Sequence, residues 1–121
     1  MNKWQAIDSF WSGFGIPAYD YSSVPDDATF PYITYEVATS SIGEPVLLTA
    51  SMWFRDTSWM AISQGADAIS QYIGMGGTII LYDGGMLWIK RGTPFAQRMS
   101  DPDDDIRRIV LNIEAEFISE N

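Results

Sequence analysis

Apolar residues recur every three or four positions in the first segment of the chain, and this spacing predicts a helix over residues 2–13. Five of them share one face: Trp4, Ile7, Phe10, Trp11 and Phe14. Two glycines and Pro17 follow within a few residues, an order typical of a helix end. We expect both tryptophans of this helix to be buried against the sheet of the same domain.

Prolines interrupt residues 16–31, which we expect to form a loop or an extended connector lying against the body of the domain. From Tyr32 to Ser40, β-branched and aromatic residues occupy nearly every position, and this predicts a strand. A turn over Ser41–Pro45 separates it from a second predicted strand, Val46–Asp56. We expect the two strands to pair as a hairpin.

Alternation gives the second of these strands two different faces. One face is apolar and consists of Leu48, Ala50, Met52 and Phe54. The other mixes apolar and polar side chains: Leu47, Thr49, Ser51, Trp53 and Arg55. A mixed face of this kind is what we expect where a partner packs.

A second helix is predicted after this strand, ending at about Ile73. Its apolar stripe consists of Trp59, Ile62, Ala66, Ile69 and Ile73. Thr57 or Ser58 supplies a hydroxyl that can cap its first turn. Its end is predicted by Gly74, Gly76 and Gly77.

Three more strands are predicted in the remainder of the chain. Thr78–Tyr82 and Met86–Arg91 flank Asp83-Gly84-Gly85, which is typical of a tight hairpin turn. Residues 92–105, with two prolines and four aspartates, are expected to be a polar loop. The last strand, Ile106–Ile118, alternates strongly, so one of its sides should be buried. That side carries Ile109, Leu111, Ile113, Ala115 and Phe117.

These elements follow the order α-β-β-α-β-β-β and predict an α+β fold. Packing two helices on one face of a mainly antiparallel sheet would bury every apolar stripe named above and give a two-layer arrangement. We find no internal repeat, low-complexity tract or linker, and we therefore predict a single domain over residues 1–121.

Composition excludes several kinds of chemistry. The chain has no cysteine and no histidine, so disulfides, thiolate metal sites and sites built on imidazole cannot form. The net charge of −9 disfavours contact with phosphates, and we expect no specific nucleic-acid binding. No apolar run approaches the roughly 20 residues that cross a bilayer, and the first residues lack a signal-peptide pattern. We expect no membrane partner and a chain that stays soluble inside the cell that makes it.

The most distinctive local pattern is the aspartate-rich run from Asp101 to Asp105. Carboxylates at alternate positions begin calcium-binding loops, because this hard cation takes several oxygen ligands. However, Ile106 occupies the place of the glycine that such a loop needs, and Asn112 occupies that of the chelating glutamate. We therefore expect a solvated acidic loop facing an arginine of another subunit, with no metal and no cofactor.

Two other patterns bear on catalysis. Glu114 and Glu116 share one face of the last strand, roughly 6.5–7 Å apart, and paired carboxylates can hydrolyse glycosides. Alternating acids on an exposed strand are, however, more typical of surface charge. The glycines at 74–77 follow a helix and precede a strand, the reverse of a phosphate-binding loop. We predict no catalytic residues and no enzymatic activity.

Basic residues gather late in the chain and are mixed with acids. Five of the seven lie between Lys90 and Arg108, among the four aspartates. Mixed charge favours a protein partner over nucleic acid, although ordinary surface charge is the alternative interpretation. Trp53 and Trp88 lie in the middle of predicted strands. If they face away from the helices, we expect that face to be buried in an assembly.

The stretch VPDDATFPYITYE, Val24–Glu36, follows the leading helix and the proline-broken connector. In this position it resembles the tail-completion and tail-terminator (head–tail joining) proteins of long-tailed phages and prophages. The helix opened by Trp59 and the final strand, Asp105–Phe117, add to the resemblance. It covers nearly the whole chain, in element order more than in identity.

This resemblance implies a structural virion protein that forms a ring of six copies, ends the tail tube and joins the tail to the head connector. Its partners would be other copies of itself, the tail tube protein and a head-completion or connector protein, with DNA passing through the ring. It would be found in the virion tail, and in the host cytoplasm during assembly. The family has no catalytic residues.

The contact regions that the resemblance implies are the hairpin tip over Ile42–Pro45, the 92–105 loop and the sheet edge. The residues that we expect at subunit interfaces are Ile42, Glu44, Trp53, Arg55, Trp88, Arg91, Arg98, Asp101, Asp103, Asp104, Asp105 and Arg107.

Two other functions stay open. The chain could be a small acidic adaptor or inhibitor protein that binds a nuclease or another DNA-binding enzyme by mimicking nucleic acid. It could also be an enzyme that uses carboxylates alone with a divalent metal. Capture of a nuclease from a lysate would favour the first, and tight uptake of magnesium or calcium would favour the second.

Overall fold

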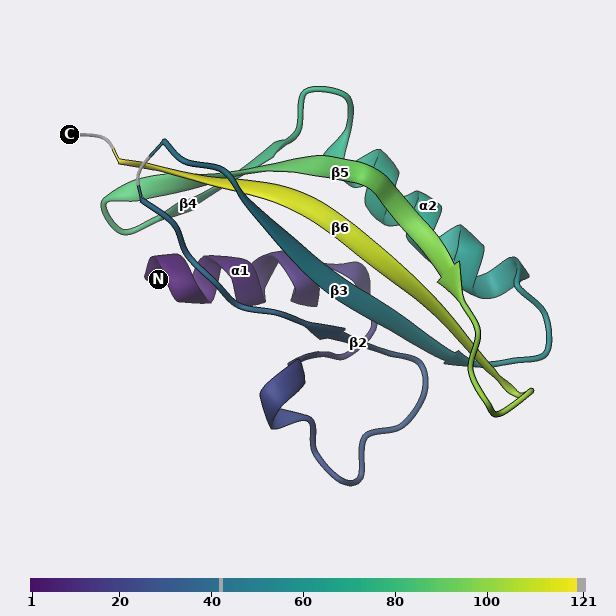
Figure 1. Cartoon of the computed structure of the whole chain (residues 1–121). Helices are drawn as coiled ribbons and strands as arrows, with labels where there is room; N and C mark the ends of the chain where they lie inside the picture. Colours follow the sequence, from purple (N-terminus) through teal and green to yellow (C-terminus); the bar gives the residue numbers. More distant parts are fainter. Residues whose placement is uncertain (42, 120–121) are drawn as a thin grey trace.

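The computed structural model describes residues 1–41 and 43–119 and has an α+β fold with two helices and a six-stranded mixed sheet (Figure 1). Short 3-10 turns lie at Ser12–Phe14 and Tyr21–Ser23. The helices and strands are α1 Lys3–Trp11, β1 Ala18–Asp20, β2 Tyr32–Tyr35, β3 Val46–Arg55, α2 Met60–Ile73, β4 Thr78–Tyr82, β5 Gly85–Met99 and β6 Ile106–Ser119.

The strands lie in the order β1-β2-β3-β6-β5-β4. Strand β1 pairs with β2 in parallel, and all other neighbours are antiparallel. The prediction of an α+β fold with two helices is confirmed, as is the pairing of β2 with β3. The predicted arrangement is not matched in full, because the sheet is mixed and contains one strand more than the order α-β-β-α-β-β-β allows.

Helix α1 is set by its cap and by its apolar stripe. The Asn2 side chain accepts the N–H of Gln5, and the Gln5 side chain accepts the N–H of Asn2, at 2.9 Å each. The helix buries Ala6, Ile7, Phe10 and Trp11. The expectation that Trp4 is buried is wrong, since 47% of its surface is exposed. Trp4 lies in the first turn, at the margin of the buried stripe.

Helix α2 follows the predicted pattern closely. It buries Ile62, Ala66, Ile69 and Ile73, and ends at Ile73 as expected. The Ser58 hydroxyl accepts the N–H of Met60 at 3.0 Å, which satisfies one free donor of the first turn. Within the described part of the chain, neither helix has the length and apolar character needed to cross a bilayer.

Three predicted boundaries are wrong. Strand β2 ends at Tyr35, well before Ser40, and the expected connector contains strand β1. The expected loop over residues 92–105 is also too long, because β5 continues to Met99 opposite β6. A register shift between Arg91 and Ala96 accommodates Pro94, which cannot donate to a ladder of hydrogen bonds.

The core lies between the helices and one face of the sheet. The alternation predicted for β6 is confirmed, because its buried side chains are Ile109, Leu111, Ile113, Ala115 and Phe117. They form one cluster with Leu48, Ala50 and Met52 of β3 and with the buried residues of both helices. Apolar surface removed from water in this way is the main stabilising contribution to the fold.

A partly buried hydrogen bond connects β2 to α1, and its loss should be measurable. The Tyr35 hydroxyl donates to Asp8 Oδ1 at 2.5 Å. Burial, and next the bond to Asp8, raise the pKa of Tyr35 above its ordinary value. A raised pKa in the folded state contributes stability that is complete below pH ~10, the unfolded value, and is lost as the pH rises further.

We therefore expect Tyr35→Phe to lower the free energy of unfolding by about 1 kcal/mol at neutral pH. The same change should reduce the loss of stability above pH ~10. Urea unfolding at neutral and alkaline pH measures both effects. The exposed Tyr21 provides the control, and equal responses of Tyr35→Phe and Tyr21→Phe would contradict the assignment.

Candidate interaction surface

The buried residues of both helices pack on one side of the sheet, and we call the opposite side the open face. On β3 and β6 it carries the residues that alternate with the buried ones, among them Thr49, Ser51, Trp53, Arg108 and Asn112. Polar contacts hold these side chains in place. Thr49 Oγ1 donates to Asn112 Oδ1 at 3.0 Å, and Asn112 Nδ2 donates to the carbonyl of Pro94, also at 3.0 Å.

Trp53 and Arg108 lie opposite each other on the open face, and both line a hollow. The guanidinium carbon of Arg108 is 4.6 Å from the centroid of the Trp53 ring. The Trp53 ring stacks near Tyr32, and its Nε1 donates to Thr34 Oγ1 at 3.0 Å. We call this hollow, of about 260 Å³, the Arg108 pocket; its lining includes Tyr21, Thr34, Glu36, Thr49, Trp53 and Arg108.

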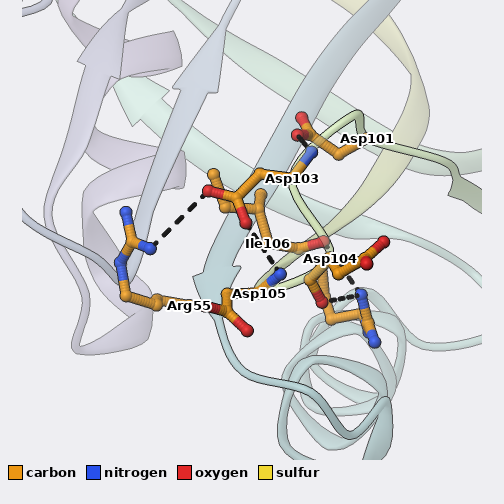
Figure 2. Close-up of polar contacts among 7 residues, drawn as sticks. Arg55, Asp101, Asp103, Asp104, Asp105 and Ile106 are labelled. Atoms are coloured by element: carbon orange, nitrogen blue, oxygen red, sulfur yellow. Dashed lines mark hydrogen bonds and ion pairs between the residues drawn. The ribbon is translucent and has the colours of Figure 1, made fainter.

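The aspartates of residues 101–105 form what we call the acidic tip, in the loop that projects at one end of the sheet between β5 and β6 (Figure 1). Asp101 Oδ1 accepts the N–H of Asp103, and Asp103 Oδ1 accepts the N–H of Asp105, at 2.9 Å each. Arg55 Nη1 lies 3.8 Å from Asp103 Oδ2. The carboxylates of Asp104 and Asp105 point away from this contact (Figure 2).

No group of three or more acidic side chains in the described residues could hold a metal ion. Each turn of the tip instead uses a carboxylate to accept a backbone N–H. Within the chain, Asp103 contacts Arg55, a contact that the sequence did not predict. A contact to an arginine of another subunit stays a prediction.

Three of the predicted interface arginines lie on the helix side of the sheet and not on the open face. Arg91 Nη1 donates to Ser70 Oγ of α2 at 2.9 Å. Arg98 and Arg107 place their guanidinium carbons 4.9 Å and 5.3 Å from the centroid of the Trp59 ring. Arg107 also donates to the carbonyl of Thr57 at 2.7 Å. The predicted interface residues are therefore divided between the two sides of the sheet.

Trp88 lies on the open face, far from Trp53. It pairs with Glu116 on β6, whereas Trp53 pairs with Arg108, so the two rings are roughly 26 Å apart along that strand. Trp88 Nε1 donates to the carbonyl of Gly76 at 2.9 Å, and Lys90 Nζ lies 4.2 Å from its ring centroid. Both tryptophans therefore face away from the helices, and neither is a core residue. This is the arrangement for which we expect the open face to be buried in an assembly.

The two glutamates of the last strand lie on the same open face. Lys90 Nζ is 3.9 Å from Glu114 Oε1, a partly exposed ion pair of a kind that contributes little stability. Glu116 lies opposite Trp88. Both glutamates are therefore side chains of the open face, as the alternation of the last strand predicted.

One sheet edge is formed by β4, the last strand in the sheet order, and we call it the β4 edge. Its outward side chains Ile79 and Leu81 are 55% and 66% exposed. No lysine, proline or bulge interrupts it, although such features commonly protect an edge from pairing with another chain. The sheet edge was predicted as a contact region, but not these two residues.

The hairpin tip is described in part. Ile42 lies outside the described residues. Glu44 is exposed, its N–H donates to the carbonyl of Ser41 at 3.0 Å, and its carbonyl accepts from the Ser40 hydroxyl. Its role at an interface stays a prediction.

Arg108 is a further residue that the predicted interface set omitted. Its alternation with the buried Ile109 on β6 was visible in the sequence and already placed it on the exposed side. What the sequence could not show is that Trp53 and Ser51 lie directly across and beside it.

Comparisons with known proteins give a similarity of fold. No protein-family model matches the chain, and no curated protein matches it. Among solved structures, the chain is similar to a chain of the "Virion of native gene transfer agent (GTA) particle". The TM-score is 0.64 at 19% sequence identity, over 95% of this chain and 93% of that chain. The shared property is the fold.

Proposed function

We propose that this chain is a structural protein of a phage-like virion, which forms a ring at the end of the tail tube and joins the tail to the head connector. The observation that carries the proposal is the fold match to a chain of the gene transfer agent virion, because it spans nearly the whole of both chains. The resemblance of Val24–Glu36 to tail-terminator proteins adds the position in the particle.

The surfaces of the chain suit a subunit that has several neighbours. The β4 edge offers exposed apolar side chains beside an outer strand. The acidic tip presents carboxylates, and the Arg108 pocket contains a guanidinium together with the carboxylate of Glu36. A net charge of −9 would also let DNA pass through a ring without being gripped.

The proposal gives the chain no catalytic step. The sequence contains neither histidine nor cysteine, which are the common groups for general base and nucleophilic catalysis near neutral pH. Its partners would be other copies of itself, the tail tube protein and a head-completion or connector protein.

Electron microscopy of particles made with and without the gene for this chain tests the proposal. We expect wild-type particles to carry a ring of this protein where the tail meets the head, and particles without it to separate into heads and tails of irregular length. Absence of the protein from purified particles would contradict the proposal. Capture of a nuclease, with no virion protein, would support an adaptor or inhibitor role in its place.

The β4 edge gives a prediction about assembly. We expect the double variant Ile79→Lys/Leu81→Lys to fold normally, because both side chains are more than half exposed, and to lose incorporation into particles. Quantifying this chain in purified particles measures the loss. Met75→Lys is the control, since Met75 is 98% exposed but lies in the turn before β4. Equal incorporation of all three proteins would contradict a role for this edge.

A further inference from the structure

We propose that the Arg108 pocket of one copy binds the carboxylates of Asp104 and Asp105 from the acidic tip of a second copy. This inference rests on the proposed function, because it names the contact by which neighbouring copies would join. It pairs two different groups of residues of the same chain, and when copies are arranged head to tail such a contact is heterologous and able to close a ring.

Arg108 is held in place without a carboxylate partner. Its Nε and Nη2 both donate to Ser51 Oγ at 3.1 Å, and Ser51 is buried. Its guanidinium also packs against Trp53, whose own Nε1 is fixed by Thr34. Across residues 1–41 and 43–119, no acidic group forms an ion pair with Arg108. A positioned guanidinium loses little conformational freedom on binding a carboxylate, which favours recognition.

Glu36 is the acidic group that lines the same pocket. Its Oε1 accepts the N–H of Thr49 at 3.2 Å, so it is engaged with the backbone of β3 and not with Arg108. Its charge opposes the entry of a second carboxylate. The pocket therefore contains one group that attracts the proposed ligand and one that repels it, and their variants should have opposite effects.

The acidic tip supplies carboxylates that have no partner. Asp101 and Asp103 use their side chains within the turn, and Asp103 also contacts Arg55. Asp104 and Asp105 have no such side-chain contact among the described residues, and both are exposed. The tip projects at the end of the sheet, so it can enter a hollow on a neighbouring molecule (Figure 1).

Charge reversal in the full chain tests the pairing. We expect the wild type to self-associate at low ionic strength, as measured by sedimentation velocity. Arg108→Glu and the double variant Asp104→Lys/Asp105→Lys should each weaken this association at least about 10-fold. In an equimolar mixture, the unchanged tip of the first variant meets the unchanged pocket of the second, and the two altered surfaces form the same pair with reversed charges. The mixture should therefore associate when neither variant does alone.

Variants that remove one negative charge show whether a residue of the pocket opposes self-association. Glu36→Gln should strengthen self-association, whereas Glu116→Gln, on the same face but outside the pocket, should leave it unchanged. Arg108→Glu removes the partner of Ser51. If this variant unfolds, the tip variant decides the question, because the tip is an exposed loop whose substitution should not affect folding.

The proposal is overturned if the wild type does not self-associate at low ionic strength, or if the tip variant self-associates as strongly as the wild type. It is also overturned if the mixed variants bind no better than each alone. These measurements use the purified chain and no particles. The proposed function is tested separately, by whether purified particles contain this chain. A negative result for the pairing can therefore be distinguished from a negative result for the proposed function.

Discussion

Trp11→Ala is expected to lower the free energy of unfolding by about 3–5 kcal/mol, the range for removing a large aromatic side chain from a core. Trp11 is fully buried at the end of α1. Its ring stacks on Tyr35 of β2, with centroids 6.4 Å apart, and meets Phe10 edge-on at 4.8 Å. Domains of this kind have about 5–15 kcal/mol in total, so the variant should be close to unfolding. Urea unfolding followed by circular dichroism measures the loss.

Two further variants define what Trp11 contributes. Trp4→Ala is the matched control, because Trp4 lies on the same helix but is nearly half exposed, and we expect it to cost less than about 1 kcal/mol. Trp11→Phe should cost less than Trp11→Ala, since Trp11 Nε1 is buried without a hydrogen-bond partner and phenylalanine removes that unsatisfied donor. Similar losses for Trp4→Ala and Trp11→Ala would contradict the burial of α1.

Elements with a strong apolar period could be predicted from the sequence. Helix α2 and strand β6 each bury one face, so their sequence alternates with the period of their own geometry. Strand β1 could not be found in this way. It has three residues, and it exists because Ala18–Asp20 pair in parallel with β2, a contact that local pattern does not encode.

The second half of β5 shows why local signals failed there. Pro94 and the polar residues around it are typical of a loop, yet Ala96–Met99 pair with β6. From Arg91, opposite Ile113, to Ala96, opposite Leu111, β5 advances by an odd number of positions, five, and β6 by an even number, two. The shift reverses which alternate positions of β5 face the core, so simple alternation cannot place both Arg91 and Arg98 on the same side.

The candidate interaction surface was predictable only in outline. Mixed charge and a mixed strand face indicated a protein partner, and Trp53 and Arg55 were placed correctly on the open face. The division of the arginines between the two sides of the sheet depends on packing with Trp59 and Ser70 of other elements. Such contacts between distant segments are fixed by the fold as a whole.

Gly77→Ala is expected to destabilise the chain by at least about 2 kcal/mol, from left-handed backbone strain and a backbone clash together. Gly77 has φ +84°, and a Cβ there would lie 2.6 Å from the carbonyl oxygen of Ile89 and 2.6 Å from Trp88 Nε1. Because the Ile89 oxygen belongs to strand β5, relief requires the backbone to move. Trp88 would then lose its bond to the carbonyl of Gly76, and the open face would change at that end.

The neighbouring glycine separates this effect from the general cost of adding a methyl group. A Cβ on Gly76 would meet no atom within 4 Å, and Gly76 does not have a positive φ. Gly76→Ala should therefore leave stability nearly unchanged or raise it by up to about 1 kcal/mol, through the lower entropy of the unfolded chain. Urea unfolding, with Trp88 fluorescence as a local probe, compares the two. Equal stability of both variants would mean that the close approach of β5 to Gly77 does not constrain this turn, and that Trp88 is held in place by other contacts.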